Sequence, residues 1–576
     1  MKQYVWNVRN SNNRKEQLLE LAENLKIHSV FAQILVQRNI LTSENAIAFF
    51  NPRIKNTHNP FLMKHMHEAT SRIIHAITTH EKILVYGDYD VDGTTAIACM
   101  YSFLKTRTPN VDFYVPDRYA EGYGVSMKGI DFAIENQYNV IITLDCGIKA
   151  HATIQKAQKA GIDVIVCDHH EPDVKIPPAY AILNPKQNDC NYPCKHLSGC
   201  GVGFKLIHAL CLTLNLNLKE HLYTYLDILA VSIASDIVPI VDENRIFMYY
   251  GLRKLQKSPH IGLKAMLNTA GIQDSEISVR DVVFKIAPRI NAAGRIFNAR
   301  KAIELLISST YDEAMKLCAY IDEYNLERRE IDAKITEEAL HMIAQNSETE
   351  NSTTTVLYKP EWHKGVIGIV ASRVIEQHYK PTIILCGNDD VITGSARSVQ
   401  GFDIYAALDT CKEYMQHFGG HMYAAGMSLK KTNLHLFQHA FESAVANTIT
   451  EAQKQPSIEI DAELHISDIT PQFYSVLTRF TPFGPENMTP VFMLRGVVDA
   501  GKTCAVGADK SHVKFHITHP HNPDIQVQGI GFGLAEKWNV ISQQSQQFDV
   551  CFTLQENVFR NTTTIQLEVR DIRATE

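Results

Sequence analysis

The sequence predicts a multidomain α/β protein in which a parallel-sheet domain is followed by a smaller α/β domain and an antiparallel β-barrel. Strand and helix patterns alternate from residue 82 to 170, which is typical of parallel sheets with crossover helices. A shorter alternation occupies residues 353–430, and short runs of alternating polar and apolar residues fill residues 456–576. With 576 residues, 45% of them hydrophobic, the chain exceeds what one core usually holds.

The first alternation predicts four strands that lie side by side, because repeated β-α units place their strands in parallel. Short helical patterns precede it up to residue 75, with Thr42 as an N-cap and Asn51-Pro52 as a stop. The expected strands are 83–87, 111–115, 139–144 and 163–167, and the expected helices are 94–107, 126–136 and 149–160.

The later elements connect and complete the domains. Helical sequence at 204–267 leads into an expected Arg-rich loop, and residues 310–346 form a charged stretch without Pro or Gly, as expected of a connecting helix. The second α/β domain is expected to have Gly-rich loops at Gly394 and Gly419-Gly420. Its expected strands are 354–358 and 382–385, with a helix at 366–377.

Composition excludes several classes of protein. No apolar run approaches the roughly 18 residues of a membrane span, and residues 1–10 lack a signal-peptide core, so a cytoplasmic location is expected. The twelve cysteines lie mostly in apolar patterns, which fits reduced, buried thiols. The net charge of -7 argues against a broadly basic exterior that grips nucleic acid, so a polyanion would have to enter a groove.

Acidic residues follow several predicted strands. Three aspartates alternate after strand 83–87, and Asp168-His169-His170 follows strand 163–167. An Asp after a strand is often only a helix cap, but a set of buried acids is costly unless cations neutralise it. The set therefore favours divalent metal. The candidate residues are Asp88, Asp90, Asp92, Asp145, Asp168, His169, His170 and Asp236.

These ligand types indicate the metal and the reaction. Carboxylates with one or two imidazoles suit Mg²⁺ or Mn²⁺ better than zinc, and the number of ligands indicates two ions. Two cations about 4 Å apart promote in-line displacement at phosphorus, so phosphoester hydrolysis is expected. Cys190, Cys194, His196 and Cys200 have zinc-ligand residue types but lack the C-x2-C spacing, and a surface loop is the favoured interpretation.

The motifs DYDVDG, LDCG, DHH and SIASD resemble the four ordered motifs of the DHH phosphoesterase superfamily. Six further segments resemble the bacterial RecJ single-strand-specific DNA exonucleases, so the resemblance covers nearly the whole chain: PDRYAEGYG, PRINAAGR, WHKGVIGIVAS, GSARS, GGHMYAAG and PFGPENMTPVF. The domains that it implies are a helical preface at 1–75, a parallel-sheet DHH catalytic domain at 76–300, a connecting helix at 301–350, a DHH-associated substrate-binding domain at 351–432 and an OB-like nucleic-acid-binding barrel at 455–576.

The resemblance implies a 5′ to 3′ exonuclease that uses Mn²⁺ or Mg²⁺ and degrades single-stranded DNA to 5′-mononucleotides in recombination and repair. It also implies a monomer, with single-strand-binding protein and a helicase as partners. The implied metal ligands are Asp88, Asp90, Asp92, Asp145, Asp168, His169 and Asp236, and the implied catalytic residues are Asp90, Asp92, Asp168, His169 and His170, with His170 facing the scissile phosphate. The implied substrate-binding residues are Arg118, Arg289, Arg295, Ser395, Arg397, Gly420 and His421.

One residue departs from the family pattern. Tyr86 stands where many relatives have His, and a phenol is a poorer metal ligand, which puts the second metal in doubt. In the barrel, each candidate for stacking on bases is also a core candidate. These aromatics are Phe483, Phe492, Phe515, Phe532 and Trp538.

Two alternatives remain open. A DHH enzyme for short oligonucleotides, cyclic dinucleotides or polyphosphate would not need the barrel or the helical preface. A non-catalytic single-strand-binding scaffold would explain Tyr86 as a sign of decay, although the intact carboxylates argue against it.

Overall fold

The computed structural model of the chain describes residues 3–10, 12–272, 276–296, 299–345, 352–559 and 562–575. The chain forms two compact units, which are described separately. The parallel-sheet unit comprises Pro52–Ile331 and Pro482–Asn487, and the barrel unit comprises Met1–Asn51, Asp332–Thr481 and Met488–Glu576.

A five-stranded sheet with the order β3-β2-β4-β5-β6 forms the centre of the parallel-sheet unit. Every pair of neighbouring strands is parallel, which confirms the predicted sheet type. The sequence pattern does not predict β6, because three residues are too few to show an alternation. The strands are β2 (Ile83–Gly87), β3 (Val111–Tyr114), β4 (Val140–Leu144), β5 (Asp163–Cys167) and β6 (Ala181–Leu183).

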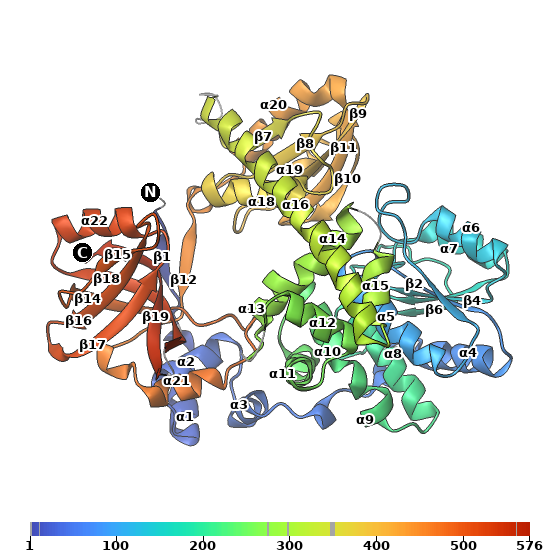
Figure 1. Ribbon diagram of the computed structural model, residues 1–576, viewed down its shortest axis with the longest axis horizontal. Helices are drawn as coiled ribbons and strands as arrows, with labels where there is room; N and C mark the ends of the chain where they lie inside the picture. Colours follow the sequence, from blue (N-terminus) through green and yellow to red (C-terminus); the bar gives the residue numbers. More distant parts are fainter. Residues whose placement is uncertain are drawn as a thin grey trace. The chain divides into compact units, whose positions relative to one another are not determined.

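Helices cover both faces of this sheet (Figure 1). Successive side chains of a strand point to opposite faces. Accordingly, Ile83 and Val85 belong to the core that includes α4, α5 and α8, whereas Leu84 and Tyr86 belong to the core that includes α6 and α7. The covering helices are α4 (Met66–Thr78), α5 (Val91–Lys105), α6 (Met127–Glu135), α7 (His151–Lys159) and α8 (Gly199–Thr213).

The remainder of the parallel-sheet unit is helical. The prediction of an Arg-rich loop is wrong, because Arg289 and Arg295 lie on a helix whose apolar residues Ala287, Ile290 and Ala293 are buried at helical spacing. These helices are α9 (Leu218–His221), α10 (Leu226–Ser235), α11 (Asp242–Lys257), α12 (Ile261–Thr269), α13 (Val279–Asp281), a π-helical turn (Val282–Ile286), α14 (Ala287–Ile296) and α15 (Arg300–Leu306).

A short segment, Pro482–Asn487, belongs to the parallel-sheet unit although the chain on either side of it lies in the barrel unit. The amide of Ile240 donates to the carbonyl of Pro485 at 2.8 Å. A Cβ at Gly484 would lie only 2.5 Å from Cγ1 of Ile240, so the close approach requires glycine here. The segment therefore packs directly behind the loop that follows Asp236.

The predicted connecting helix is α16 (Tyr311–Gln345), a single helix of 35 residues. Its residues belong to both units, with the division between Ile331 and Asp332. The absence of Pro and Gly from this stretch lets the backbone hydrogen bonds continue without a break.

The smaller α/β domain has a five-stranded sheet with the order β10-β11-β9-β8-β7. The prediction that Gly394, Gly419 and Gly420 lie in loops is wrong, because all three lie in strands. A Cβ at Gly420 would lie 2.2 Å from the carbonyl oxygen of Ala424, so the strand geometry excludes larger residues. The elements are β7 (Thr355–Tyr358), α18 (Ile367–Gln377), β8 (Thr382–Cys386), β9 (Val391–Arg397), α19 (Ile404–Asp409), β10 (Met415–His421), β11 (Ala424–Lys430) and α20 (Leu434–Ala446).

The C-terminal strands form a seven-stranded sheet with the order β13-β14-β18-β19-β17-β16-β15, and pairing of β14 with β16 closes it. Most pairs are antiparallel as predicted, but β13–β14 and β17–β19 are parallel. The elements are β12 (Ser457–Ile460), β13 (Ala462–Glu463), α21 (Pro471–Thr478), β14 (Phe492–Asp499), β15 (Cys504–Val506), β16 (His512–His519), β17 (Asn522–Gly531), α22 (Ala535–Gln544), β18 (Phe548–Phe559) and β19 (Thr562–Ala574).

The N-terminal segment 1–75 is not entirely helical as predicted. It includes a strand, β1 (Val5–Val8), which pairs in parallel with β12. The four residues VWNV have the β-branched and aromatic composition of a strand. The helices that follow are α1 (Lys15–Leu25), α2 (Ser29–Gln37) and α3 (Ser43–Phe50).

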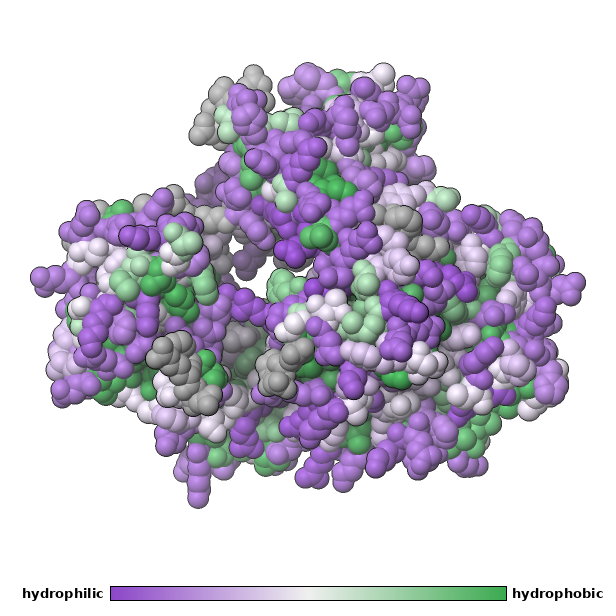
Figure 2. Space-filling view, viewed as in Figure 1, coloured by the Kyte–Doolittle hydropathy of each residue, from purple (hydrophilic) through white to green (hydrophobic). Residues whose placement is uncertain are grey.

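Hydrophilic residues predominate on the face of the molecule drawn in Figure 2, and the apolar residues on it are scattered. Across the described ranges, every helix is too short or too polar to cross a membrane.

Candidate metal centre

Three adjacent strands of the parallel sheet end in buried aspartates. Asp88, Asp145 and Asp168 follow β2, β4 and β5, and each is at most 2% exposed. Gly87 pairs with Leu144, and Leu144 pairs with Cys167, so the three strands end at the same level. The carboxylates therefore meet at the carboxyl edge of the sheet, where α/β proteins commonly place their ligands.

Two further aspartates begin the helix that follows β2. Asp90 is the N-cap of α5, and its side chain accepts a hydrogen bond from the amide of Gly93 at 3.0 Å. A Cβ at Gly93 would lie 2.3 Å from the carbonyl oxygen of Asp88, so glycine permits the tight turn from strand to helix. This turn brings Asp92, in the first turn of α5, into the same cluster.

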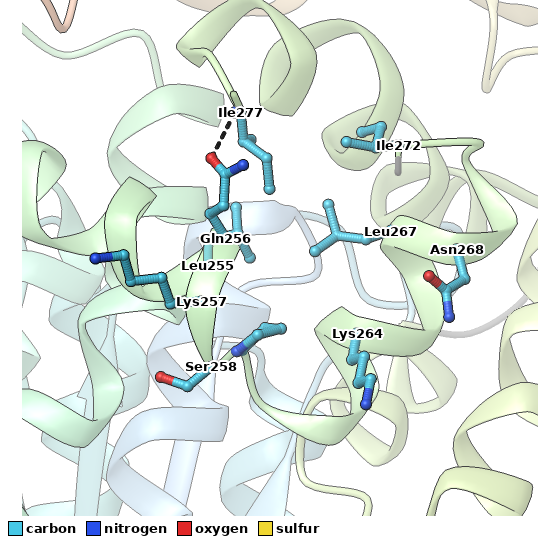
Figure 3. A pocket seen from close by; sticks show the side chains of 10 residues that line it. Leu255, Gln256, Lys257, Ser258, Lys264, Leu267, Asn268, Ile272 and Ile277 are labelled. Atoms are coloured by element: carbon cyan, nitrogen blue, oxygen red, sulfur yellow. Dashed lines mark hydrogen bonds between the residues drawn. The ribbon is translucent and has the colours of Figure 1, made fainter. Parts of the chain in front are cut away.

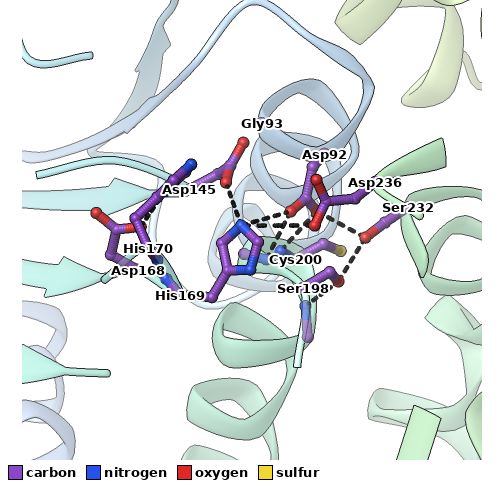
Figure 4. A network of polar contacts seen from close by, with 12 residues as sticks. Asp92, Gly93, Asp145, Asp168, His169, His170, Ser198, Cys200, Ser232 and Asp236 are labelled. Atoms are coloured by element: carbon purple, nitrogen blue, oxygen red, sulfur yellow. Dashed lines mark hydrogen bonds and ion pairs between the residues drawn. The ribbon is translucent and has the colours of Figure 1, made fainter. Parts of the chain in front are cut away.

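The start of α8 holds Asp92 in place (Figure 4). Its carboxylate accepts hydrogen bonds from the amides of Gly199 at 2.6 Å and Cys200 at 2.9 Å, and from the hydroxyl of Ser232 at 2.6 Å. Backbone amides at a helix N-terminus are favourable partners for an anion. A Cβ at Gly199 would lie 2.5 Å from Cβ of Asp145, so glycine also lets α8 approach the cluster. The sequence gives no indication of the two amide donors, whereas Ser232 lies in the SIASD motif.

Cys200 contributes its amide here, and its thiol lies in the core 3.9 Å from the thiol of Cys99. Cys190 and Cys194 are also buried, at 4% and 3% exposure, although the segment between β6 and α8 is a loop as expected and exposes Asp189 and Pro193. Among the described residues, neither metal-capable cluster includes a cysteine. The apolar side chains around them explain why these thiols are buried.

Asp168 orients the two histidines that follow it. Its Oδ1 accepts from the amides of His169 at 2.7 Å and His170 at 3.1 Å, and lies 2.7 Å from Nδ1 of His170. Its Oδ2 accepts from the amide of Ile148 at 2.9 Å. Both oxygens thus accept hydrogen bonds from protein groups, so Asp168 orients the two histidines, and its role as a metal ligand stays a prediction. Burial acts to raise the pKa of Asp168, but the hydrogen bond from His170 and the other donors hold it at about 2.

His169 lies at the meeting point of three carboxylates (Figure 4). Its Nε2 is 3.2 Å from Oδ1 of Asp145, 3.5 Å from Oδ2 of Asp236 and 3.8 Å from Oδ2 of Asp92. Two overlapping groups could each hold a cation: Asp92 with His169 and Asp236, and Asp145 with His169 and His170. The first group combines residues that are distant in the sequence and come together only in the fold.

Within the described part of the chain, four buried atoms of the cluster make no hydrogen bond: Asp88 Oδ2, Asp145 Oδ1, His169 Nε2 and Asp236 Oδ2. The contacts of His169 with Asp145 and Asp236 would be ion pairs only with a charged imidazole, which burial disfavours. An unsatisfied buried polar atom costs about 1–3 kcal/mol, and such atoms are rare in folded proteins. Divalent cations would satisfy all four with ligand types that suit Mg²⁺ and Mn²⁺. The residues present therefore fit the expected metal.

The electrostatics of the cluster agree with this interpretation. Burial, followed by repulsion from Asp92, raises the pKa of Asp90, Asp145 and Asp236. Burial and then Asp90 raise the pKa of Asp88, and burial lowers the pKa of His169. Protonation of the carboxyl groups and binding of a cation are thus alternative ways of reducing the repulsion between them.

The hydroxyl of Tyr86 is not part of this cluster. Its side chain is fully buried, and its hydroxyl donates to the carbonyl of Gly124 at 3.1 Å and accepts from the amide of Ser126 at 3.1 Å. The expectation that Tyr86 stands in the place of a metal ligand therefore finds no support in the geometry. Asp88, two residues later, provides the carboxylate at this strand end.

Three predicted substrate-binding arginines lie in the parallel-sheet unit. The guanidinium of Arg118 lies 5.0 Å from the ring centre of Tyr89, beside the cluster. Arg295 lies on α14, where its carbonyl accepts from the hydroxyl of Tyr119. Arg289 pairs with Asp322 at 2.9 Å, so its charge is already engaged.

The other predicted substrate-binding residues lie together in the smaller α/β domain of the barrel unit. Arg397 on β9 and His421 on β10 both pair in register with Ala424 of the strand between them. Nη1 of Arg397 donates to Oγ of Ser395 at 3.0 Å. Gly420, next to His421, is the glycine whose close approach to β11 was described above. The structure thus groups these residues at one end of their sheet.

A separate pocket of about 470 Å³ lies between the end of α11 and α12 (Figure 3). Its floor includes the buried side chains of Leu255, Leu267, Ile272 and Ile277. None of the predicted site residues lines it, so it is distinct from the metal centre.

Comparisons with known families match three parts of the chain. The family of the DHH N-terminal domain matches residues 82–233, the DHHA1 domain matches residues 351–447, and the RecJ OB domain matches residues 460–571.

Individual relatives extend these matches over most of the chain. The single-stranded-DNA-specific exonuclease RecJ of Bacillus subtilis (strain 168) is 37% identical over 566 residues, which cover 98% of this chain and 70% of that protein. The protein of the same name from Escherichia coli (strain K12) is 34% identical over 445 residues, 74% of this chain and 77% of the relative. Among solved structures, RecJ from Thermus thermophilus in complex with Mn²⁺ has a TM-score of 0.84 and 25% identity, covering 99% of this chain and 80% of that one.

The unsatisfied atoms and raised pKa values predict pH-dependent stabilisation by metal. Because the folded-state pKa values of Asp88, Asp145 and Asp236 exceed the unfolded ones, the metal-free protein loses stability as pH rises through those values. Mn²⁺ replaces the protons, so the Tm gain on adding Mn²⁺ to EDTA-treated protein should be larger at pH 8 than at pH 6. At a hundredfold excess over Kd the gain corresponds to about 2.7 kcal/mol.

Asp145→Asn should remove most of this gain, whereas Asp131→Asn, which alters a surface pair with Lys156, should retain it. Differential scanning fluorimetry measures all three proteins. An equal Tm gain for Asp145→Asn and the unaltered chain would contradict the assignment.

Proposed function

Because this chain belongs to the RecJ family of single-stranded-DNA-specific exonucleases, we propose that it hydrolyses single-stranded DNA from the 5′ end and releases 5′-mononucleotides. The observation that carries this proposal is the convergence of six carboxylates and two histidines, with four unsatisfied buried atoms, at the carboxyl edge of the sheet. Recombination and repair are the proposed processes, and single-strand-binding protein, a helicase and the monomeric state remain predictions from the resemblance.

We assign two cation positions within the cluster. Asp92, His169 and Asp236 would hold one ion, and Asp88, Asp90 and Asp145 would hold the second. Bound there, Mn²⁺ or Mg²⁺ would supply an activated water and a counter-charge for the scissile phosphate. The α8 amides on Asp92 keep that carboxylate fixed, so the ligands need little rearrangement on binding.

His169 and His170 have different proposed roles. His169 turns its Nε2 toward Asp145 and Asp236, whereas Asp168 holds Nδ1 of His170 and the hydroxyl of Tyr123 lies 3.0 Å from Nε2 of that ring. The hydrogen bond to Asp168 outweighs burial and raises the pKa of His170. A protonated His170 beside the substrate would offset the negative charge of the scissile phosphate.

Recognition of the 5′ end is assigned to Arg397. Its guanidinium is packed beside α18, so closely that a Cβ at Gly368 would lie 2.8 Å from Nη2. In the described part of the chain no carboxylate pairs with Arg397, and burial lowers its pKa. A half-buried guanidinium whose partners are Ser395 and a carbonyl group is suited to bind a terminal phosphate.

The barrel supports a polymeric substrate over the small-molecule alternative. Among the five candidate aromatics, Phe492 and Phe515 are fully buried, whereas Phe532 is 60% exposed. The ring of Phe532 lies 5.2 Å from that of His512, and the exposed Lys514 is the next residue on that face of β16. An exposed ring beside basic groups is typical of single-strand binding, so Phe532 is the proposed stacking residue.

End-labelled substrates test the direction and the metal requirement. We expect release of labelled mononucleotide first from 5′-labelled single strands with Mn²⁺ or Mg²⁺, none with EDTA, and little from blunt duplex. Asp236→Asn should lower the rate at least about a hundredfold, because a metal ligand is lost, while Asp131→Asn should retain it. First release from the 3′ end would refute the proposed direction.

Arg397→Ala tests the 5′-phosphate site. Hydrogen bonds to a charged group contribute about 1.5–3 kcal/mol, so kcat/KM on 5′-phosphorylated strands should fall about ten- to a hundredfold. Strands with a 5′-hydroxyl should be affected much less. The control Lys412→Ala removes a surface charge from the same domain. Equal losses on both substrates would refute the site.

Phe532→Ala tests the barrel. Stacking contributes about 1–3 kcal/mol per base, so affinity for long single strands should fall at least about fivefold, with little change for strands too short to reach the barrel. Fluorescence anisotropy with the metal-free protein measures both, and Leu436→Ala is a control for loss of an exposed apolar side chain. Unchanged affinity for long strands would exclude Phe532.

A further inference from the structure

The loop between β3 and α6, residues 116–125, contacts the metal centre at two points. The hydroxyl of Tyr123 lies 3.0 Å from Nε2 of His170 and 3.2 Å from the carbonyl oxygen of Asp145, to which it donates. The amide of Gly124 donates to Oδ1 of Asp88 at 3.3 Å. The loop therefore contacts both the histidine assigned to the phosphate and a carboxylate assigned to a metal.

The contact from Tyr123 completes the support of the His170 ring. Asp168 lies 2.7 Å from Nδ1 and Tyr123 lies 3.0 Å from Nε2, so partners on both sides of the imidazole fix the direction of its plane. With Nδ1 alone held, the ring could still tilt about that one hydrogen bond. Tyr123 itself is 56% exposed, so few packing contacts hold it, and its position depends on the rest of the loop.

A buried polar network holds the base of the loop. The carboxylate of Glu121 accepts from the hydroxyl of Tyr114 at 2.9 Å, the amide of Asp117 at 2.9 Å and the hydroxyl of Ser126 at 2.6 Å. Gly122 and Gly124 have φ angles of 84° and 83°, so the backbone on either side of Tyr123 is in the left-handed region that glycine allows.

Tyr86 joins this network to the sheet. Its hydroxyl donates to the carbonyl of Gly124 and accepts from the amide of Ser126, so a single phenol holds the loop directly after Tyr123. Its ring is fully buried and stacks on Tyr114 with centroids 5.3 Å apart. Gly129 lies so close that a Cβ there would be 2.5 Å from Cε2 of Tyr86. The ring cannot move, and its hydroxyl is therefore a fixed anchor.

We propose that Tyr86 is a positioning residue that acts through Tyr123, and that Tyr123 sets the orientation of His170 toward the scissile phosphate. This proposal rests on the proposed function. It assigns Tyr86 a role through the loop and not through a metal, in agreement with the position of its hydroxyl. Neither tyrosine needs to touch the reacting atoms, because both act on the ring of His170.

A double-mutant cycle in the full-length protein tests the pathway. Tyr86→Phe and Tyr123→Phe each remove one hydroxyl, and each should lower kcat on 5′-phosphorylated single strands about tenfold at saturating Mn²⁺, because small misplacements of a catalytic group reduce rate steeply. KM and the Mn²⁺ concentration for half-maximal activity should change less than about twofold. The double variant should be no slower than Tyr123→Phe, because the two act in series.

Tyr138→Phe is the matched control. Tyr138 belongs to the same core, is 7% exposed, and its hydroxyl donates to Asp112 on β3, at 3.0 Å and outside the loop. It should retain the kcat of the unaltered chain. Multiplicative losses in the double variant, or unchanged kcat for either single variant, would overturn the proposal.

Hydrogen exchange of peptides from residues 117–126 provides a readout that does not depend on nuclease activity. Exchange should be faster in Tyr86→Phe than in the unaltered chain or Tyr138→Phe, because the loop loses its anchor. Unchanged exchange in Tyr86→Phe overturns the proposal even if the protein is an active nuclease. If the unaltered chain fails to degrade single strands, the proposed function fails instead, so the two failures are distinguishable.

Discussion

Repulsion between buried carboxylates is the constraint on which this structure depends. Six aspartates meet at the end of one sheet, and burial together with their mutual repulsion raises the pKa of four of them. Two features of the fold keep them together. Gly93 and Gly199 let backbone segments approach closely, and the amides of α8 hold Asp92. The unsatisfied atoms left over are the places where divalent cations fit.

Much of the fold follows from patterns that a sequence displays directly. Strands β2, β4 and β5 are buried on both faces, so they are continuous apolar runs that end at the residues predicted, and the acids after them had to meet once the strands were parallel. Such patterns do not indicate β6, which is too short to alternate. They also mistake Gly394 and Gly420 for loop residues, because glycine in a strand is required by its neighbours and not by its own conformational preference.

The candidate site, too, could be predicted only in part from the sequence. Side chains with unusual chemistry, such as those of Asp145 and His169, are visible in the sequence, but their supports are not. The amides of Gly199 and Cys200 could belong to any residue type, and only the packing of α8 against α5 reveals that they hold Asp92. The way in which Asp168 orients the histidines is likewise a matter of geometry, because the sequence does not show that four protein groups contact its carboxylate.

The parallel-sheet unit is not a continuous length of chain, because it includes the distant segment Pro482–Asn487. This segment lies beyond the smaller α/β domain in sequence, yet its carbonyl at Pro485 binds the amide of Ile240, four residues after Asp236. A fragment that ends after α16, or after the smaller α/β domain, would contain every acidic motif and still lack the support behind one metal ligand. Truncation before residue 482 thus removes part of the parallel-sheet unit itself, whereas an internal replacement of the barrel strands that keeps residues 482–487 would leave that unit whole.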